Sequence, residues 1–187
     1  MKLRGIFAVL GAACLLTAPV RAEEATYALD GGRSRVEFTA RSTGHDFEGW
    51  TGGIKGRMTI DRERVSVAAP IEVVIPVLSL TTGIPARDHA MQHMFHADRF
   101  PDIRYTVTAI RPIGEGKYRL DGALLIAGVS KPLSIDTDGV FEGETVTVTG
   151  RAPLTVTDFG LRPPSMLGFM SVRPDITLSF KTVWKRA

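Results

Sequence analysis

Apolar and polar residues alternate with period two through most of this chain, and this pattern constrains its fold more than any other feature. Val36, Phe38 and Ala40 share one face of a predicted strand, and the residues between them are polar. Strands of this kind belong to antiparallel sheets with one face in the core and one in water. The same spacing recurs at Ile54, Met58 and Ile60, at Ile103, Tyr105 and Val107, at Leu120, Leu124 and Ile126, at Leu133 and Ile135, at Val146 and Val148, and at Ile176, Leu178 and Phe180.

Turn residues separate these segments, among them Asp30-Gly31-Gly32, Gly52-Gly53 and Asp138-Gly139. No long helical pattern alternates with the strands, so a parallel α/β sheet is not expected. About eight strands are predicted. The fold class is therefore all-β, and an even number of antiparallel strands favours closure into a barrel, which removes exposed edges. A β-sandwich is the alternative, and regular spacing alone does not separate the two.

Glycines interrupt the apolar faces at Gly56, Gly122 and Gly150. An eight-stranded barrel is just wide enough to be filled by side chains or to hold one slender ligand. Glycine contributes no packing volume, so these positions either leave room for a ligand or mark bulges and bends that curve the sheet.

One segment, from Leu78 to Pro101, departs from the alternation. Pro85 opens it and Phe100-Pro101 closes it, as at the ends of a helix. One short helix in a β chain is expected to plug a barrel or to grip a ligand. Residues at helical spacing are Ala86, Ala90, Met94 and Ala97, and also Met91 and Phe95.

Residues 1–22 are typical of a secretory signal peptide. Lys2 and Arg4 form a basic start, an apolar stretch follows from Ile6 to Leu16, and Val20-Arg21-Ala22 offers a cleavage site. The apolar stretch is shorter than the roughly 20 residues that span a bilayer. We expect cleavage after Ala22, leaving residues 23–187 as one periplasmic domain without a membrane span, although transient membrane contact is compatible with this.

Removal of that segment changes the charge. The formal net charge is +3, but Lys2, Arg4 and Arg21 precede the first acidic residue, so 20 basic residues remain against 20 acidic ones. A near-neutral domain does not indicate a nucleic-acid partner. Cys14, the chain's one cysteine, leaves with the same segment. The oligomeric state stays open, with a dimer as one option.

Histidine occurs at His45, His89, His93 and His96. On a helix the last three would fall at i, i+4 and i+7, a spacing that suits a metal. The glutamate that follows the first histidine in a zinc-protease helix is absent, since Ala90 stands there. The other interpretation is that these are polar residues at a barrel mouth, able to bind the polar end of a ligand.

Other catalytic signals are weak. The chain has no Gly-x-Ser-x-Gly elbow and no phosphate-binding glycine loop. Asp158-Phe159-Gly160 lacks the companion motifs of a kinase and is expected at a strand end followed by a turn. No nucleophile or acid–base pair stands out. The sequence therefore predicts a binding protein and no enzyme, with no cofactor beyond a bound ligand.

Methionine is concentrated in two segments predicted not to be strands. Met91 and Met94 lie in the helical segment, and Met166 and Met170 lie in the apolar run from Arg162 to Met170. Methionine suits adaptable apolar contacts. The two segments either cap the barrel ends as core or contact an apolar ligand, and the two roles are compatible.

From about Ala25 onward the chain resembles the YceI-like family of periplasmic proteins. Several ordered motifs carry the resemblance: Tyr27-Ala-Leu-Asp30, Ser34-Arg-Val-Glu-Phe38, His45 with Phe47, Gly56-Arg-Met-Thr-Ile-Asp61, Leu80-Thr-Thr-Gly83, Arg87-Asp-His89, Phe100-Pro-Asp-Ile103, the run from Gly122 to Pro132, and Asp158-Phe-Gly160. The run from Pro163 to Met170 has no clear match.

The resemblance implies a lipocalin-like, eight-stranded antiparallel barrel with an elongated apolar cavity. It also implies a long-chain isoprenoid or related lipid as ligand, such as a polyprenyl phosphate or a quinone, and a role in lipid storage, transport or envelope stress. For the polar head of the lipid, the expected contacts are His45, Arg87, Asp88 and His89. For the tail they are Phe38, Phe47, Met58, Met91, Met94, Phe95, Met166 and Phe169.

Two rival functions follow from the same residues. One is a metal-dependent hydrolase built on His89, His93 and His96. The other is a non-catalytic envelope protein that uses the barrel as a scaffold for a protein partner.

Overall fold

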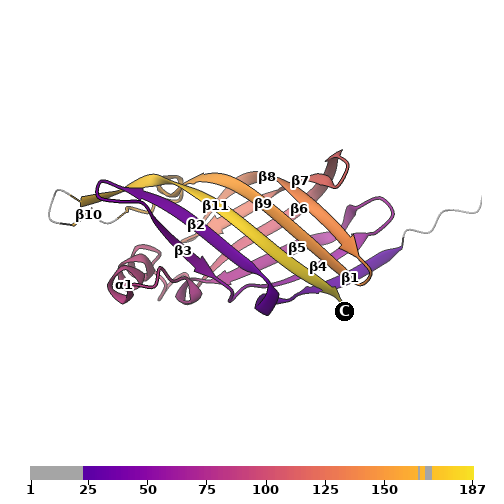
Figure 1. Cartoon of the computed structure of the whole chain (residues 1–187), viewed down its shortest axis with the longest axis horizontal. Coiled ribbons are helices and arrows are strands. Elements are labelled where there is room, and N and C mark those ends of the chain that lie inside the picture. The colour runs from indigo at the N-terminus through magenta and orange to yellow at the C-terminus, as the bar shows by residue number, and fades with distance from the viewer. Residues whose placement is uncertain (1–22, 164, 167–169) are drawn as a thin grey trace, which may run out of the picture.

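The computed structural model describes residues 23–163, 165–166 and 170–187, and for Ser165, Met166 and Met170 it describes the backbone alone. Strands make up most of this part of the chain, and they wind into an elongated barrel with α1 at one end (Figure 1). The strands are β1 (Glu24–Leu29), β2 (Arg35–Ser42), β3 (Phe47–Thr51), β4 (Lys55–Asp61), β5 (Ser66–Pro76), β6 (Asp102–Gly114), β7 (Lys117–Ile126), β8 (Val129–Glu142), β9 (Thr145–Thr155), β10 (Ser165–Met166) and β11 (Met170–Arg186). The helices are α1 (Pro85–Met94) and three short 3-10 turns, η1 (Gly31–Arg33), η2 (Val77–Ser79) and η3 (Val156–Phe159).

Eight antiparallel strands close the barrel. Their order around it is β1-β4-β5-β6-β7-β8-β9-β11, and β11 pairs back to β1. The β2–β3 hairpin extends the wall from β11 towards α1. It joins the far side through two hydrogen bonds between Trp50 and Thr81, of 2.8 and 3.0 Å. The predicted barrel is therefore confirmed, and the sandwich is excluded.

Each of the seven alternating segments overlaps a strand, but β1, β3 and β5 were not singled out as alternating runs. In β5 the alternation is hidden by Ala68-Ala69-Pro70 and by the continuous apolar run from Val73 to Ile75. The register of β5 against β4 also shifts twice, between Arg57 and Ile60. In a strand with an irregular register, the apolar residues need not fall at every second position.

The interior contains two buried apolar clusters, one towards each end of the barrel. The cluster near α1 consists of Val77, Leu80, Met91, Phe95, Leu124, Ile126, Val156, Phe159 and Leu161. The distal cluster consists of Ala25, Tyr27, Met58, Ile60, Ile71, Val107, Val146 and Trp184.

Tyr105 packs against both clusters from the middle of β6. Its hydroxyl, which has one proton to donate, lies within hydrogen-bond distance of the carbonyl oxygens of Leu120 at 3.2 Å and Leu133 at 3.0 Å. Burial, with a smaller contribution from the charge of Asp121, raises the pKa of Tyr105. The phenol therefore stays protonated and ties β6 to the backbones of β7 and β8 inside the barrel.

The three interior glycines do not leave empty space. A Cβ atom on Gly122 would overlap the carbonyl oxygen of Thr106, next to a register shift between Val107 and Ala109. A Cβ atom on Gly56 would lie 2.9 Å from the Trp184 ring, and one on Gly150 would lie 2.6 Å from the Phe180 ring. The interpretation of these glycines as room for a ligand is thus wrong. They allow a bulge and the close packing of two aromatic rings.

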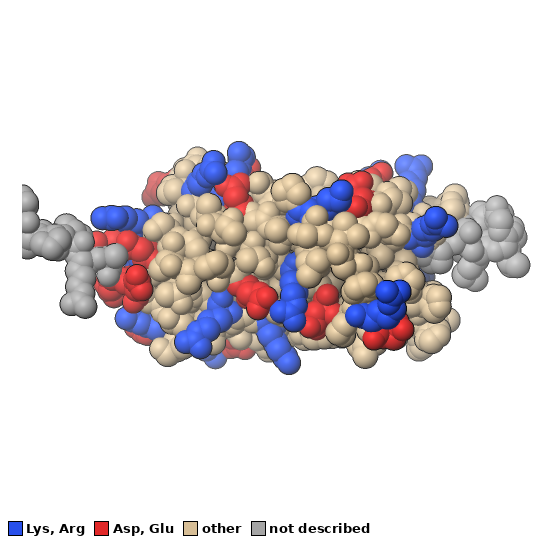
Figure 2. All heavy atoms as spheres, turned by 180° about the vertical axis from the view of Figure 1, so that it is seen from behind, with Lys and Arg blue, Asp and Glu red and all other residues tan. Residues whose placement is uncertain are grey.

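No helix in the described part of the chain is both long and apolar enough to cross a membrane. Figure 2 shows one face of the barrel, on which Lys and Arg are interspersed with Asp and Glu. Neither sign of charge dominates that face, so it offers no broad basic surface of the kind that binds nucleic acid.

Candidate ligand-binding site

The helix α1 closes one end of the barrel. Pro85 lies in its first turn, where no intrahelical N–H bond is lost. Met91 and Phe95, four residues apart on one face, are both 8% exposed and belong to the cluster near α1. Met94 and Ala97 pack against the same cluster. The predicted helix is confirmed, and it acts as a plug made of core residues.

Three of the predicted ligand contacts come together beside this plug. The rings of Phe38 and Phe47 meet edge to face, with centroids 6.5 Å apart. The guanidinium carbon of Arg87 lies 4.2 Å from the centroid of the Phe47 ring, a cation–π contact. Gly49, paired with Phe38 across β2 and β3, leaves the space that the Phe38 ring occupies. The aromatic pair therefore forms part of the wall, with a cation outside it.

The carboxylate of Asp88 is hydrogen-bonded within the protein. It accepts hydrogen bonds from the Thr81 hydroxyl at 2.6 Å, the Thr82 backbone N–H at 2.7 Å and the Thr82 hydroxyl at 2.6 Å. Burial raises the pKa of Asp88, but these hydrogen bonds and the nearby charge of Arg87 outweigh it, so the pKa lies below the ordinary value of 3.8. These bonds make Asp88 an anchor between α1 and the segment after η2, and its contact with a head group stays a prediction.

Replacing Asp88 with alanine is expected to lower the free energy of unfolding at neutral pH by about 1.5–3 kcal/mol, since bonds to a charged acceptor are lost. The folded-state pKa is lowered, so the charge-dependent part of this stabilisation is full above the unfolded pKa and is lost as the pH falls through the lower folded pKa. In urea titrations from pH 7 down to about pH 3, the difference between the two forms should therefore shrink at the acid end. Exposed Asp98 is the control, and Asp98→Ala should change stability little. A difference for Asp88 that stays constant with pH would contradict this role.

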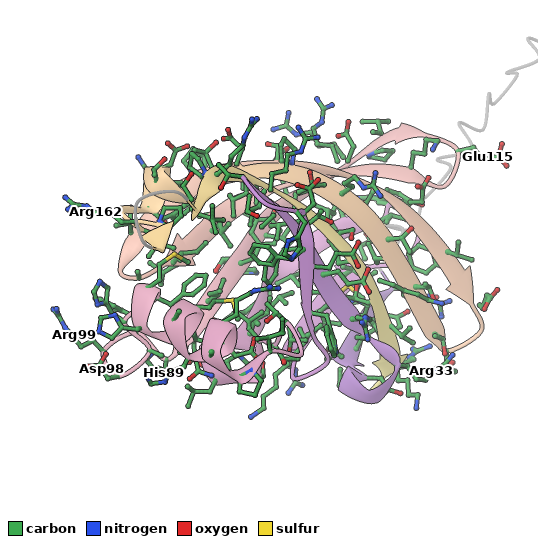
Figure 3. All side chains as sticks on the ribbon, turned by 60° about the vertical axis from the view of Figure 1, so that its left-hand side comes forward. Arg33, His89, Asp98, Arg99, Glu115 and Arg162 are labelled. Atoms are coloured by element: carbon green, nitrogen blue, oxygen red, sulfur yellow. The ribbon has the colours of Figure 1, made fainter. Side chains whose placement is uncertain are left out.

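The histidines do not form one face. His89 and His93 are exposed on α1, but His96 lies beyond the end of the helix in a left-handed conformation with φ of 52°. Figure 3 shows His89, Asp98 and Arg99 at the end of the molecule where α1 lies. Residues 23–163, 165–166 and 170–187 include no group of three His, Cys, Asp or Glu that could hold a metal ion. The prediction that His89, His93 and His96 share one face of a helix, on which the hydrolase hypothesis was built, is thus wrong.

The remaining predicted contacts are scattered. His45 is exposed in the turn between β2 and β3. Met58 is buried in the distal cluster, where it borders a small apolar cavity of about 30 Å³. The backbone of Met166 belongs to β10 and pairs with Met170 in β11, so this segment is partly a hairpin and not a loop throughout. Phe169 lies outside the described residues.

A larger cavity, of about 460 Å³, is open to solvent and is lined by residues of β8, β9, η3 and β11. It falls within the range of roughly 300–1,000 Å³ that is typical of small-molecule pockets. We call it the β8–β9 slot; its lining residues are Lys131, Pro132, Leu133, Pro153, Leu154, Thr155, Asp158, Phe159, Asp175 and Ile176.

The slot exists because two neighbouring strands separate. The β8–β9 register runs from Glu142 opposite Thr145 to Thr137 opposite Gly150, and the rest of both strands lies beyond it. Leu133, Leu154 and Ile176 pack against the cluster near α1, and Phe159 belongs to that cluster. The apolar lining of the slot is thus in contact with the buried cluster near α1.

Sequence reasoning placed Leu133 and Ile176 on inward faces but did not recognise this site. The available signal was proline in two alternating strands, at Pro132 and Pro153. A proline inside a strand indicates an unpaired edge or a bulge. The η3 turn that follows β9 contains Asp158 and Phe159 and ends at Gly160 with φ of 74°, as expected for a turn after a strand.

A comparison of sequences decides the family. The profile of the YceI-like domain matches residues 27–184. The chain belongs to the YceI-like family. A UPF0312 protein of Shewanella baltica is 28% identical over 176 residues, covering 87% of this chain and 89% of that protein. A UPF0312 protein of Vibrio vulnificus is 25% identical over 162 residues, covering 81% and 85%.

Solved structures share the fold of this YceI-like chain. BcnA of Burkholderia cenocepacia superposes with a TM-score of 0.74 at 19% identity, over 83% of this chain and 98% of BcnA. A polyisoprenoid binding domain from Saccharophagus degradans, implicated in plant cell wall breakdown, gives a TM-score of 0.68 at 16% identity, over 86% and 98%. The YceI protein of Campylobacter jejuni gives 0.62 at 21% identity, over 74% and 84%.

Proposed function

We propose that this protein binds a long-chain isoprenoid or related lipid and holds the apolar tail inside the barrel. The observation that carries the proposal is the β8–β9 slot, whose inner residues Leu133, Leu154, Phe159 and Ile176 continue into the apolar cluster near α1. The polyisoprenoid-binding neighbour with the same fold supports the choice of lipid.

The energetics suit such a ligand. Each buried methylene group is worth about 0.8 kcal/mol, so a long tail offers more transfer free energy than binding requires. Ordering the tail opposes this, and the free energy per atom falls as ligands grow. The protein then needs an apolar interior and a few polar groups at its surface, without any catalytic machinery. We accordingly assign it a binding role and no reaction.

The setting of this role is also a proposal. With residues 1–22 acting as a signal peptide, the domain would work in the periplasm, where it would store or carry lipid or respond to envelope stress. A polyprenyl phosphate and a quinone are the two head-group classes that we consider.

The experiment is extraction of lipid from protein purified without detergent from a bacterial periplasm, followed by mass spectrometry. We expect a long-chain isoprenoid close to one per protein molecule. A matched sample of Leu154→Asp, processed in parallel, should carry much less, since the change puts a charge in the slot. If the two samples hold equal traces of mixed membrane phospholipid, the isoprenoid proposal fails.

A further inference from the structure

Both ends of the barrel are occupied by its own side chains. At one end, Met91 and Phe95 of α1 are buried among strand residues. At the other, Tyr27 is fully buried and Trp184 is 4% exposed, and the cavity there measures only about 30 Å³. Entry of a lipid tail through either end of the barrel is therefore obstructed by packed side chains, whereas the β8–β9 slot offers a cavity of about 460 Å³ at the side.

Two prolines prevent β8 and β9 from closing this slot. Pro132 pairs with Ala123 of β7, and Pro153 pairs with Thr177 of β11, both in uninterrupted registers. A proline fits within such a ladder only when its nitrogen faces away from the paired strand. Both nitrogens, which lack a hydrogen to donate, therefore face the slot.

The register confirms this geometry independently. Continuing the β8–β9 pairing past Thr137 would place Pro153 opposite Ser134 and Pro132 opposite Thr155. These two positions are two residues apart on each strand, so they would be pairs of the same kind. With both nitrogens facing the slot, both would be pairs that exchange hydrogen bonds, and each would lack a donor. Each strand thus contains a proline that prevents pairing at the slot.

The slot also has the layout of a passage for an amphiphile. Its outer rim carries the exposed polar groups Lys131, Asp158 and Asp175, and its inner wall is apolar. The rim is fixed in part by a hydrogen bond of 2.7 Å from the Thr155 hydroxyl to the Asp175 carboxylate. A chain that passes between β8 and β9 thus leaves water and reaches apolar contacts within the thickness of the wall.

We propose that the β8–β9 slot is the lateral portal through which the apolar chain of the lipid enters and leaves the barrel. This inference rests on the proposed function, because it needs a lipid to pass. It predicts that obstruction of the slot slows lipid exchange, whereas obstruction of the α1 end does not.

The test places a bulky group at each candidate entrance. In a Cys14→Ala background, which removes the chain's one native thiol, Lys131→Cys and His89→Cys each introduce a single exposed thiol. Each variant is loaded with a fluorescent long-chain polyprenol, capped with polyethylene-glycol maleimide, and mixed with phosphatidylcholine vesicles. Transfer of the polyprenol to the vesicles is followed with time, against the same uncapped variant.

Capping at Lys131→Cys is expected to slow transfer about tenfold or more, since passage through the portal controls release. Capping at His89→Cys should leave the rate within about twofold, because the reagent lies outside the passage. Equal rates for capped and uncapped Lys131→Cys would overturn the portal, and so would slowing at His89→Cys alone, which would place the entrance under α1. Failure of the unmodified protein to bind polyprenol at all would instead show, before any capping, that the proposed function is wrong.

A second pair of variants tests the prolines. The double change Pro132→Thr with Pro153→Val restores both backbone donors and should let the ladder extend, slowing transfer. Exposed Pro70 in β5 is the control, and Pro70→Thr should transfer at the rate of the unmodified protein. A double variant that folds, binds and transfers at the original rate would contradict the role given to the prolines.

Discussion

Gly122→Ala should destabilise the barrel by about 3 kcal/mol, near the upper end of the usual cost of overpacking. The added methyl group would overlap the Thr106 carbonyl oxygen and would lie 3.0 Å from the Cα atom of Val107. These are backbone atoms of the neighbouring strand, so no side-chain rotation relieves the clash. β6 and β7 would have to separate at the bulge, and the change would appear as a lower urea midpoint.

Gly32→Ala is the matched control for this prediction. Gly32 lies in η1, and the nearest atom to an added methyl group would be an Asp30 carboxylate oxygen at 3.5 Å. Alanine there should be neutral or stabilising by up to about 1 kcal/mol, because it restricts the unfolded chain. Equal losses at both glycines would show that close backbone contact is not the reason for Gly122.

Leu154→Asp is expected to abolish most lipid binding while the barrel still folds. Leu154 is half-buried, lines the slot and pairs with Ile176 across β9 and β11. A carboxylate against the tail should cost on the order of 2–3 kcal/mol of binding free energy, roughly a hundredfold in affinity. Without lipid the same carboxylate can reach water through the slot, so the loss of stability should be smaller. Titration and thermal unfolding of delipidated protein measure the two effects separately.

Thr157→Asp is the control for this change. Thr157 is exposed on η3 and is not one of the residues that line the slot. Its lipid affinity should stay close to that of the unmodified protein. If both aspartates weaken binding equally, the effect is one of net charge, and the tail does not lie against Leu154.

The sequence was sufficient for the strands and the helical plug because both depend on local periodicity, whereas closure into a barrel depends on the distant pairing of β11 with β1. Alternation at Val36, Phe38 and Ala40 and the four-residue spacing of Met91 and Phe95 are properties of short segments. The role of Asp88 could not be read in this way. Its partners Thr81 and Thr82 lie seven and six residues away, and their hydrogen bonds to the carboxylate depend on how the segment after η2 meets α1.

The site itself was harder to predict than the fold. The slot arises from a failure of two strands to pair, and no residue in it stands out by chemical type. Leu133 and Leu154 have the spacing of ordinary core residues. The effect of Pro132 and Pro153 on strand pairing can be inferred only when β8 and β9 are known to be neighbours. Conversely, His45 and His89, which the sequence suggested as polar contacts of the ligand, are exposed and do not line the slot.

The most direct test of an apolar tail held inside the barrel is a calorimetric titration of delipidated protein with isoprenoids that share one head group and differ in chain length. We predict that affinity rises with each added isoprene unit until the interior is filled, and that binding carries a negative heat-capacity change, the mark of apolar burial. A polyprenyl phosphate series and a quinone series, run side by side, would identify the preferred head group. Affinity that is independent of chain length, with no heat-capacity change, would contradict the account.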